Sequence, residues 1–115
     1  MKKSNKTISK RERKFKWNDA KEVIKNGKKV KYQKILIAFQ KSKEWRFRIN
    51  ITKNIKPAVF RNHIKRIIRE AYRTSKPILN HPHQVVFTVL KGQKQLDFHD
   101  FKKKYIDLLR NNANN

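Results

Sequence analysis

An apolar stripe inside a strongly basic segment restricts most how this chain can fold. Residues 60–73 read FRNHIKRIIREAYR, and six of these fourteen residues are Arg, Lys or His. At about 100° per residue, the apolar positions fall in one arc with the spacing of a helix that packs on a core. These positions are Phe60, Ile64, Ile67, Ile68 and Ala71. The pattern predicts a long amphipathic helix that begins near Pro57 and ends near Ser75, before Pro77 interrupts it.

The polar side chains of this helix gather in a neighbouring arc, which contains Arg61, Asn62, Lys65, Arg66, Arg69 and Arg73. Glu70 is the only acid of the segment. Like charges one turn apart disfavour an isolated helix, so we expect an external anion to compensate this face. The amide of Asn62 has two possible roles, since it can hydrogen-bond the local backbone or an external ligand.

The charge of the whole chain favours the same kind of partner. Its 115 residues include 32 Lys and Arg against 8 acids, a formal charge of +24. Self-repulsion of this size destabilises a compact state unless a polyanion neutralises it, so nucleic acid is the first candidate and an anionic membrane the rival. No apolar run approaches the roughly 20 residues that span a bilayer, and the basic N-terminus lacks the apolar segment of a secretory signal. With no cysteine in the chain, we expect a cytoplasmic protein without a membrane partner.

The remaining pattern predicts one domain over residues 1–115. Residues 1–16 carry eight basic residues and one acid, which predicts a flexible basic arm that orders on a polyanion. A short helix follows, capped by Asn18 or Asp19 and ending at Gly27 in the left-handed region. Residues 30–39 predict a strand that enters the core at residues 35–39, and residues 46–52 alternate strictly. Two consecutive strands of this kind suggest an antiparallel pair.

The second half of the chain predicts one more strand and one more helix. Residues 85–90 form a β-branched run, typical of a strand that has neighbours and cover on at least one face. The last helix places its apolar side chains on one stripe, formed by Phe98, Phe101, Tyr105, Leu108 and Leu109. The order of elements predicts an α+β fold, a two-layer α/β sandwich with one roughly four-stranded sheet and about three main helices.

The sequence contains no evident catalytic set. His81 and His83 flank Pro82 without matching acids or cysteines, and we interpret them as histidines of a surface loop. Asp97 and Asp100 lie near the start of the last helix, where carboxylates complement the helix dipole. The two glycines of the chain cannot form a Gly-rich phosphate loop. We predict no catalytic and no metal-ligating residue.

The positive signal is a binding surface. The alternation of residues 46–52 places Arg46, Arg48 and Asn50 on one face of their strand. If the basic helix packs beside that face, the two form a basic trough in which Arg binds phosphate bidentately and stacks on bases. Outward-facing residues of an ordinary half-buried strand explain Arg46 and Arg48 equally well.

The run ITKNIKPAVFRNHIKRIIREAYR, residues 51–73, resembles the signature of the bacterial ribonuclease P protein subunit. The pattern of that family is roughly S-V-S-K-K-x-G-x-A-V-x-R-N-R-x-K-R-x-x-R-E. The matching residues here are Lys53, Ala58, Val59, Arg61, Asn62, Lys65, Arg66, Arg69 and Glu70. The basic N-terminal segment, the first helix ending at Gly27, the size and the order of elements also agree.

The resemblance implies an accessory role in an RNA-based enzyme. The protein would bind a catalytic RNA and hold the single-stranded 5′ leader of precursor tRNA in a cleft of sheet and helix. The RNA, with Mg²⁺, would hydrolyse the phosphodiester bond, with no protein-bound cofactor and no obligate protein partner. The family fold also implies a left-handed βαβ crossover through the basic helix.

With these implications, the expected RNA-binding residues are Arg11, Arg13, Arg46, Arg48, Asn50, Lys53, Arg61, Asn62, Lys65, Arg66 and Arg69. Positions where relatives often carry aromatics hold Ala20, Ile24 and Ala38 here. Bases would then stack elsewhere, for instance on Phe15 or Trp17.

Two other classes of protein share part of this pattern. A structural RNA-binding protein of the ribosomal type has similar charge, size and architecture. A DNA-binding module would place the basic helix in a major groove. The Arg-Asn-x-x-Lys-Arg core, preceded by Lys53 and Ala58, favours the ribonuclease P subunit over the first class. The second lacks the short-turn helix pair or dimerisation stripe that such modules need.

Overall fold

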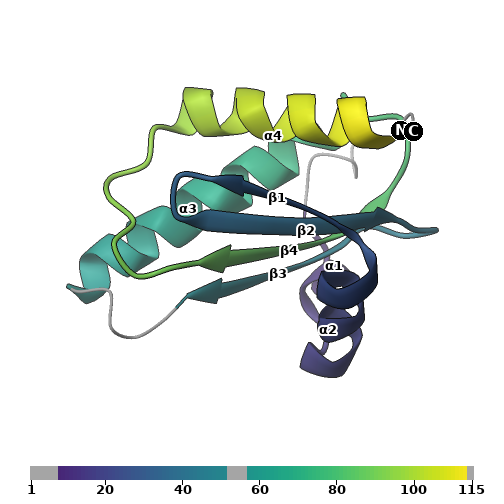
Figure 1. Ribbon diagram of the computed structural model, residues 1–115, viewed down its shortest axis with the longest axis horizontal. Coiled ribbons are helices and arrows are strands. Elements are labelled where there is room, and N and C mark those ends of the chain that lie inside the picture. Colours follow the sequence, from purple (N-terminus) through teal and green to yellow (C-terminus); the bar gives the residue numbers. More distant parts are fainter. Residues whose placement is uncertain (1–7, 52–56, 114–115) are drawn as a thin grey trace.

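One sheet with helices on both faces forms the molecule. The computed structural model describes residues 8–51 and 57–113. The elements in chain order are α1 (Lys10–Arg13), α2 (Trp17–Asn26), β1 (Lys28–Tyr32), β2 (Ile35–Lys41), β3 (Arg46–Ile51), α3 (Ala58–Ser75), β4 (His83–Val89) and α4 (Phe98–Ala113). Helices α3 and α4 cover one face, while α2 crosses the other (Figure 1). The predicted α+β class with a four-stranded sheet is confirmed.

The strand order is β1-β2-β4-β3, which corrects two details of the sequence prediction. Residues 30–39 are not one strand but a β1–β2 hairpin that turns at Gln33, whose φ is +54°. The strands β2 and β3 do not pair with each other. Strand β4 lies between them, antiparallel to β2 and parallel to β3. Its β-branched residues are buried on both faces, so β4 takes the central position.

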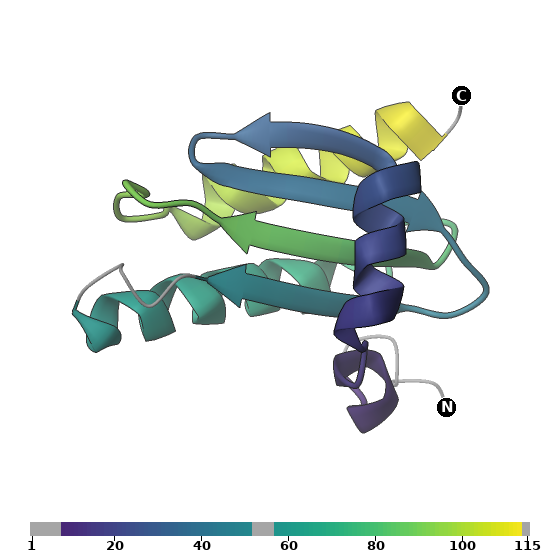
Figure 2. The ribbon, with the colours of Figure 1, turned by 60° about the horizontal axis from the view of Figure 1, so that its bottom comes forward.

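The connection from β3 through α3 to β4 joins two parallel strands of the same sheet. When α2 faces the viewer and both strands point up, β4 lies to the right of β3 and α3 lies behind the sheet (Figure 2). This arrangement is a left-handed crossover, as the family resemblance implies. Most crossovers of this type are right-handed.

The main core lies between the sheet and helices α3 and α4. The predicted stripe of α3 is confirmed: Ile64, Ile67, Ile68 and Ala71 are buried there, and Phe60 is half-buried at the edge. The stripe of α4 buries Phe101, Tyr105 and Leu109. A smaller core under α2 contains Phe15, Ala20, Val23, Ala38 and Val86.

The beginning of the chain differs from the predicted mobile arm. Residues 1–7 lie outside the described residues, but residues 8–16 pack against the domain. Helix α1 has a capping box between Ser9 and Glu12, and Phe15 is only 2% exposed. Lys76 Nζ donates to both carboxylate oxygens of Glu12 at 2.8 and 3.0 Å, and the Tyr72 hydroxyl donates to the same carboxylate. For residues 8–16 the structure therefore differs from a mobile arm, because one acid among many cations carries no pattern that points to its distant partners, while the prediction for residues 1–7 falls outside the described residues.

The two predicted ends of α2 are also corrected. The helix begins at Trp17, and its N-cap Lys16 makes no side-chain cap. Gly27 is extended, with φ −82° and ψ 178°, rather than left-handed. A Cβ on Gly27 would lie 2.5 Å from the Phe39 carbonyl oxygen. Glycine is therefore required by a close approach of α2 to β2, and not by backbone dihedrals.

Candidate nucleic-acid interface

The predicted basic trough does not form, because the two sets of polar residues lie on opposite sides of the edge strand β3. Phe47, Ile49 and Ile51 face the core beneath α3 and α4. Alternation then places the side chains of Arg46, Arg48 and Asn50 on the face crossed by α2. The sequence could not place α3, because the partner of β3 was unknown. The interface therefore consists of two surfaces, which we call the α3 face and the open sheet face.

The α3 face is formed by the outward side chains of α3, namely Arg61, Asn62, Lys65, Arg66 and Arg69. Within the described residues, no ion pair involves Lys65, Arg66 or Arg69. Glu70, the single acid of the helix, forms an ion pair with Arg73, whose Nη2 lies 2.6 Å from Glu70 Oε1. The hydrogen bond from Arg73 lowers the pKa of Glu70, and the charges of Arg66 and Arg69 lower it further. The α3 face thus keeps most of its positive charge for an external anion.

Asn62 lies on the exposed side of α3. Its amide makes no hydrogen bond to any described residue, so it does not cross-link the local backbone there. This geometry leaves the amide available to a ligand. Lys53, which the sequence also assigned to RNA binding, lies outside the described residues.

The cations of the open sheet face are used differently. Arg48 Nη1 donates to the Phe15 carbonyl oxygen at 3.1 Å, and Arg48 Nε donates to Asn50 Oδ1 at 2.9 Å. Its guanidinium also lies over the Trp17 ring, 5.4 Å from the centroid. Arg48 therefore holds the N-terminal segment on β3, as a structural residue does.

Glu44 neutralises two further cations on this side. Arg11 Nε lies 3.1 Å from one Glu44 oxygen, and Arg46 Nη2 lies 3.7 Å from the same atom. Arg13, at the end of α1, is exposed. Of the predicted RNA-binding cations in this region, Arg11 and Arg46 thus share their charge with an acid.

Only one of the two aromatic stacking candidates is accessible. Phe15 is buried in the small core under α2. Trp17 is 44% exposed at the first turn of α2, with its ring against the Arg48 guanidinium. A half-exposed indole on a cationic support can stack on an unpaired base.

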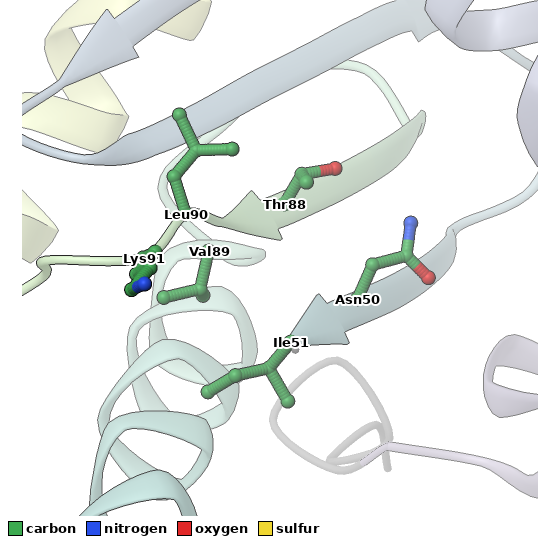
Figure 3. Close-up of a pocket in the computed structure, with 6 residues that line it drawn as sticks. All are labelled: Asn50, Ile51, Thr88, Val89, Leu90 and Lys91. Atoms are coloured by element: carbon green, nitrogen blue, oxygen red, sulfur yellow. The ribbon is translucent and has the colours of Figure 1, made fainter. Parts of the chain in front are cut away.

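A pocket of about 440 Å³ lies where strands β3 and β4 end, and residues of both faces of the sheet line it, namely Asn50, Ile51, Thr88, Val89, Leu90 and Lys91. Figure 3 shows Asn50 and Thr88 projecting from the neighbouring strands β3 and β4, with Leu90 and Lys91 just beyond the end of β4. Asn50 and Thr88 are register partners and lie on the open sheet face. Apolar side chains beside an amide, a hydroxyl and a nearby ammonium suit a nucleobase and its phosphate.

Sequence reasoning missed Thr88 and Lys91 in this pocket. A continuous apolar run shows no alternation of polar and apolar residues, so it does not indicate which side chains remain exposed. The signal was the single hydroxyl of Thr88 among β-branched apolar residues. This hydroxyl could be assigned to the pocket only when the pairing of β4 with β3 was known.

The prediction that both His81 and His83 belong to a surface loop is correct for His81 and wrong for His83. His81 is exposed in the loop before β4, but His83 is the first residue of β4 and is 2% exposed. Asp97 behaves as expected, since its Oδ2 accepts from the Asp100 backbone amide at 2.9 Å at the start of α4. Among the described residues, no three His, Asp or Glu side chains are grouped to hold a metal ion. Nor is any described helix long and apolar enough to cross a membrane.

Known proteins provide a comparison for a region of the chain that includes both the basic helix and the crossover. Residues 8–112 match the sequence model of the family described as Ribonuclease P. The chain belongs to the ribonuclease P family. This match spans both surfaces of the interface, from α1 to the last turns of α4.

Relatives of ribonuclease P type agree over nearly the full chain. The ribonuclease P protein component of Dictyoglomus turgidum is 33% identical over 103 residues, covering 86% of this chain and 87% of that protein. That of Clostridioides difficile is 33% identical over 96 residues, covering 81% and 84%. Among solved structures, an RNase P protein from Staphylococcus aureus superposes with a TM-score of 0.73 at 21% identity, covering 90% of each chain. The RNase P protein from Thermotoga maritima gives a TM-score of 0.65 at 24% identity, covering 81% of this chain and 90% of that one.

Proposed function

We propose that this chain is the protein subunit of ribonuclease P, which binds the catalytic RNA and the 5′ leader of precursor tRNA and so promotes 5′ maturation of tRNA. The family match and the relatives named as ribonuclease P protein components support this function over a ribosomal role. The observation that carries the proposal is the α3 face, an arc of cations on a helix whose one acid is already paired.

The two surfaces suggest a division of tasks. The α3 face is suited to the phosphates of a large folded RNA, because its cations are exposed or half-exposed and Lys65, Arg66 and Arg69 make no ion pair within the described chain. The open sheet face offers Trp17, Asn50 and Thr88, which can stack on and hydrogen-bond unpaired bases. We assign the catalytic RNA to the α3 face and the single-stranded leader to the open sheet face.

In this proposal the RNA carries the chemistry. Mg²⁺ bound by the RNA supplies the metal-ion catalysis of phosphodiester hydrolysis. The protein contributes cations that reduce repulsion between the RNA and its substrate, and contacts that position the leader. The protein acts in the cytoplasm without a membrane or an obligate protein partner.

The test is cleavage of precursor tRNA by the cognate RNA at low Mg²⁺, with and without the protein. We expect strong stimulation by the protein with the RNA, and no cleavage by highly purified protein alone. Replacement of both Lys65 and Arg69 by Ala should abolish most of the stimulation at moderate salt. A matched control is Lys104→Ala on α4 together with Lys94→Ala in the loop before it, which removes the same charge elsewhere. Equal loss in both double variants would show that net charge, and not the α3 face, is responsible.

A further inference from the structure

A second cavity, which we call the α4 pocket, lies at the end of β4 away from the open sheet face. Its volume is about 280 Å³, and its walls come from three elements. They are the loop before β4 (Leu79, Asn80, His81), the first residue of β4 (His83) and the last turns of α4 (Leu109, Arg110). Because β4 spans seven residues at about 3.3 Å each, the two pockets lie roughly 20 Å apart.

His83, one of the residues that line the α4 pocket, has a buried hydrogen-bond acceptor without a partner in the described part of the chain. His83 Nδ1 lies 2.8 Å from the carbonyl oxygen of His81. A carbonyl can only accept, so Nδ1 carries the proton in this contact and the neutral ring leaves a lone pair on Nε2. Nε2 is buried and has no hydrogen-bond partner within the described part of the chain.

The surroundings keep this imidazole neutral. Burial lowers the pKa of His83, and the nearby charges of Lys41 and His81 lower it further. The rings of Phe39 and Trp45 flank it, with centroids 6.2 and 5.7 Å away. A protonated ring would lose hydration without gaining an acid, since no carboxylate lines the pocket.

The polarity of the α4 pocket selects its ligand. A bare anion would face the lone pair of Nε2, whereas an N–H or O–H donor would satisfy it. Leu79 and Leu109 provide apolar walls for a flat ring, and the Asn80 amide can both donate and accept. At the rim, Arg110 is exposed and makes no ion pair among the described residues. A flat ring with an N–H donor and an attached phosphate meets all of these features.

The neighbouring surface continues beyond this single site. Arg110 also borders a shallow hollow on α4 that Ile78, Lys102, Lys103 and Asp107 line. A chain of phosphates leaving the α4 pocket past Arg110 would therefore meet two further cations and one acid, which leaves a net positive charge there. This continuity favours a segment of RNA over a free nucleotide.

We propose that the α4 pocket binds one unpaired nucleotide of RNA, whose base donates an N–H to His83 Nε2 while Arg110 contacts its phosphate. The proposal rests on the proposed function for RNA as the partner. It adds a contact separate from both the α3 face and the open sheet face.

Nuclear magnetic resonance of the ¹⁵N-labelled histidines in the full chain tests the pocket directly. The probes are the four ribonucleoside 5′-monophosphates, a short single-stranded oligoribonucleotide and inorganic phosphate. We expect the Nε2 resonance of His83 to shift and saturate with the oligoribonucleotide and with at least one monophosphate, but not with phosphate alone. No shift of His83 at saturating oligoribonucleotide would overturn the proposal, and so would a response to Zn²⁺ alone.

Variants separate this pocket from the rest of the interface. Arg110→Gln should weaken the nucleotide-induced shift of His83 by about tenfold in affinity, as loss of a charged hydrogen bond does. Lys104→Gln, an exposed cation of the same helix outside both hollows, should change it less than about twofold by charge screening alone. His83→Phe should remove binding at this site while it keeps a flat ring in place. If that variant does not fold, the outcome still rests on Arg110→Gln and the wild-type resonance.

Failure of this inference and failure of the proposed function give different results. Unchanged affinity in Arg110→Gln, with normal stimulation of precursor-tRNA cleavage by the wild type, would refute the pocket alone. Absence of stimulation by the wild type, with a His83 shift on addition of nucleotide, would refute the proposed function and retain the pocket.

Discussion

Arg48 on β3 and Arg69 on α3 are the same residue type on two surfaces of one basic protein, yet their surroundings differ. Arg48 is held by the Phe15 carbonyl, the Asn50 amide oxygen and the Trp17 ring. Arg69 has no ion pair within the described residues, and its neighbour Glu70 is bound to Arg73. The first guanidinium contributes to the fold, while the second is available to a ligand.

The difference shows that the net charge of +24 is not all available for binding RNA, because part of it is used within the fold. Some cations are used to attach the N-terminal segment: Lys76, at the end of α3, pairs with Glu12, Arg11 pairs with Glu44, and Arg48 donates to the Phe15 carbonyl oxygen. Lys65, Arg66 and Arg69 of the α3 face have no such ion pair among the described residues. Substitutions on the two sides should therefore separate into losses of stability and losses of binding.

The largest effect is expected at Glu12, where a buried acid pairs with a buried amine. Glu12→Ala leaves Lys76 without its partner in a site where its side chain is only 3% exposed. Removing one member of a buried pair costs about 3–5 kcal/mol. Chemical denaturation should show this loss in the free energy of unfolding. A loss below about 1 kcal/mol would mean that the N-terminal segment is not anchored through Glu12.

Arg48→Ala should give the next largest loss in the free energy of unfolding. It leaves the Phe15 carbonyl oxygen without its charged donor, and hydrogen bonds of this kind contribute about 1.5–3 kcal/mol. RNA affinity per folded molecule should change little if Arg48 is structural. The matched comparison is Arg46→Ala, whose Glu44 contact is longer and should cost less. Unchanged stability with a large loss of RNA affinity would reverse the assignment of Arg48.

Arg69→Ala and Lys65→Ala should show the opposite pattern. We expect their free energies of unfolding to stay within about 0.5 kcal/mol of the wild type, as for ordinary surface changes. Affinity for the catalytic RNA should fall, and the slope of log affinity against log salt should decrease by about one unit for each variant. Titrations at several salt concentrations measure this, and an unchanged slope would exclude a phosphate contact at that position.

Asn62→Ala sharpens the comparison because it changes no charge. Its amide makes no hydrogen bond to the described residues, so stability should be unaffected or slightly raised by the better helix propensity of Ala. RNA binding or leader handling should weaken if the amide contacts RNA. Thermal melts and binding titrations on the same samples decide between the roles, and unfolding with normal binding per folded molecule would make Asn62 structural.

The smallest effect concerns pH. Burial raises the pKa of Glu12, but hydrogen bonds from Lys76, the Ser9 backbone and Tyr72 outweigh it, so the folded pKa lies below the ordinary 4.5. A depressed acid pKa contributes stability above the unfolded value and loses it as pH falls through the folded value. Wild-type stability should therefore fall below pH 4.5 more steeply than that of Glu12→Gln. Parallel curves for the two proteins would contradict the lowered pKa.

The parts of the fold set by local pattern were predictable from the sequence. The helical spacing of Phe60 to Ala71 located α3 and its buried side, and strict alternation located the two faces of β3. The β-branched run of β4 indicated a central strand. The family signature then supplied the crossover hand, which no spacing contains.

The parts set by distant partners were not predictable. The Glu12–Lys76 pair joins residues 64 positions apart, and neither has a local pattern that indicates it. The predicted basic trough does not form, because the position of β4 beside β3 determines which face of the sheet α3 covers. His83 looked like a loop residue, since the start of β4 was set by pairing with Lys41 and not by its own neighbours.

The same 64-residue separation has a consequence for synthesis of the protein. Glu12 is synthesised 64 residues before Lys76, and translation at about 5–20 residues per second makes that interval roughly 3–13 s. During this time, the five cations of residues 8–16 have no fixed position on the domain. The nascent chain therefore carries a loose polycation next to ribosomal RNA. The segment can pack on the finished domain only after α3 supplies Tyr72 and Lys76 and β4 supplies Val86.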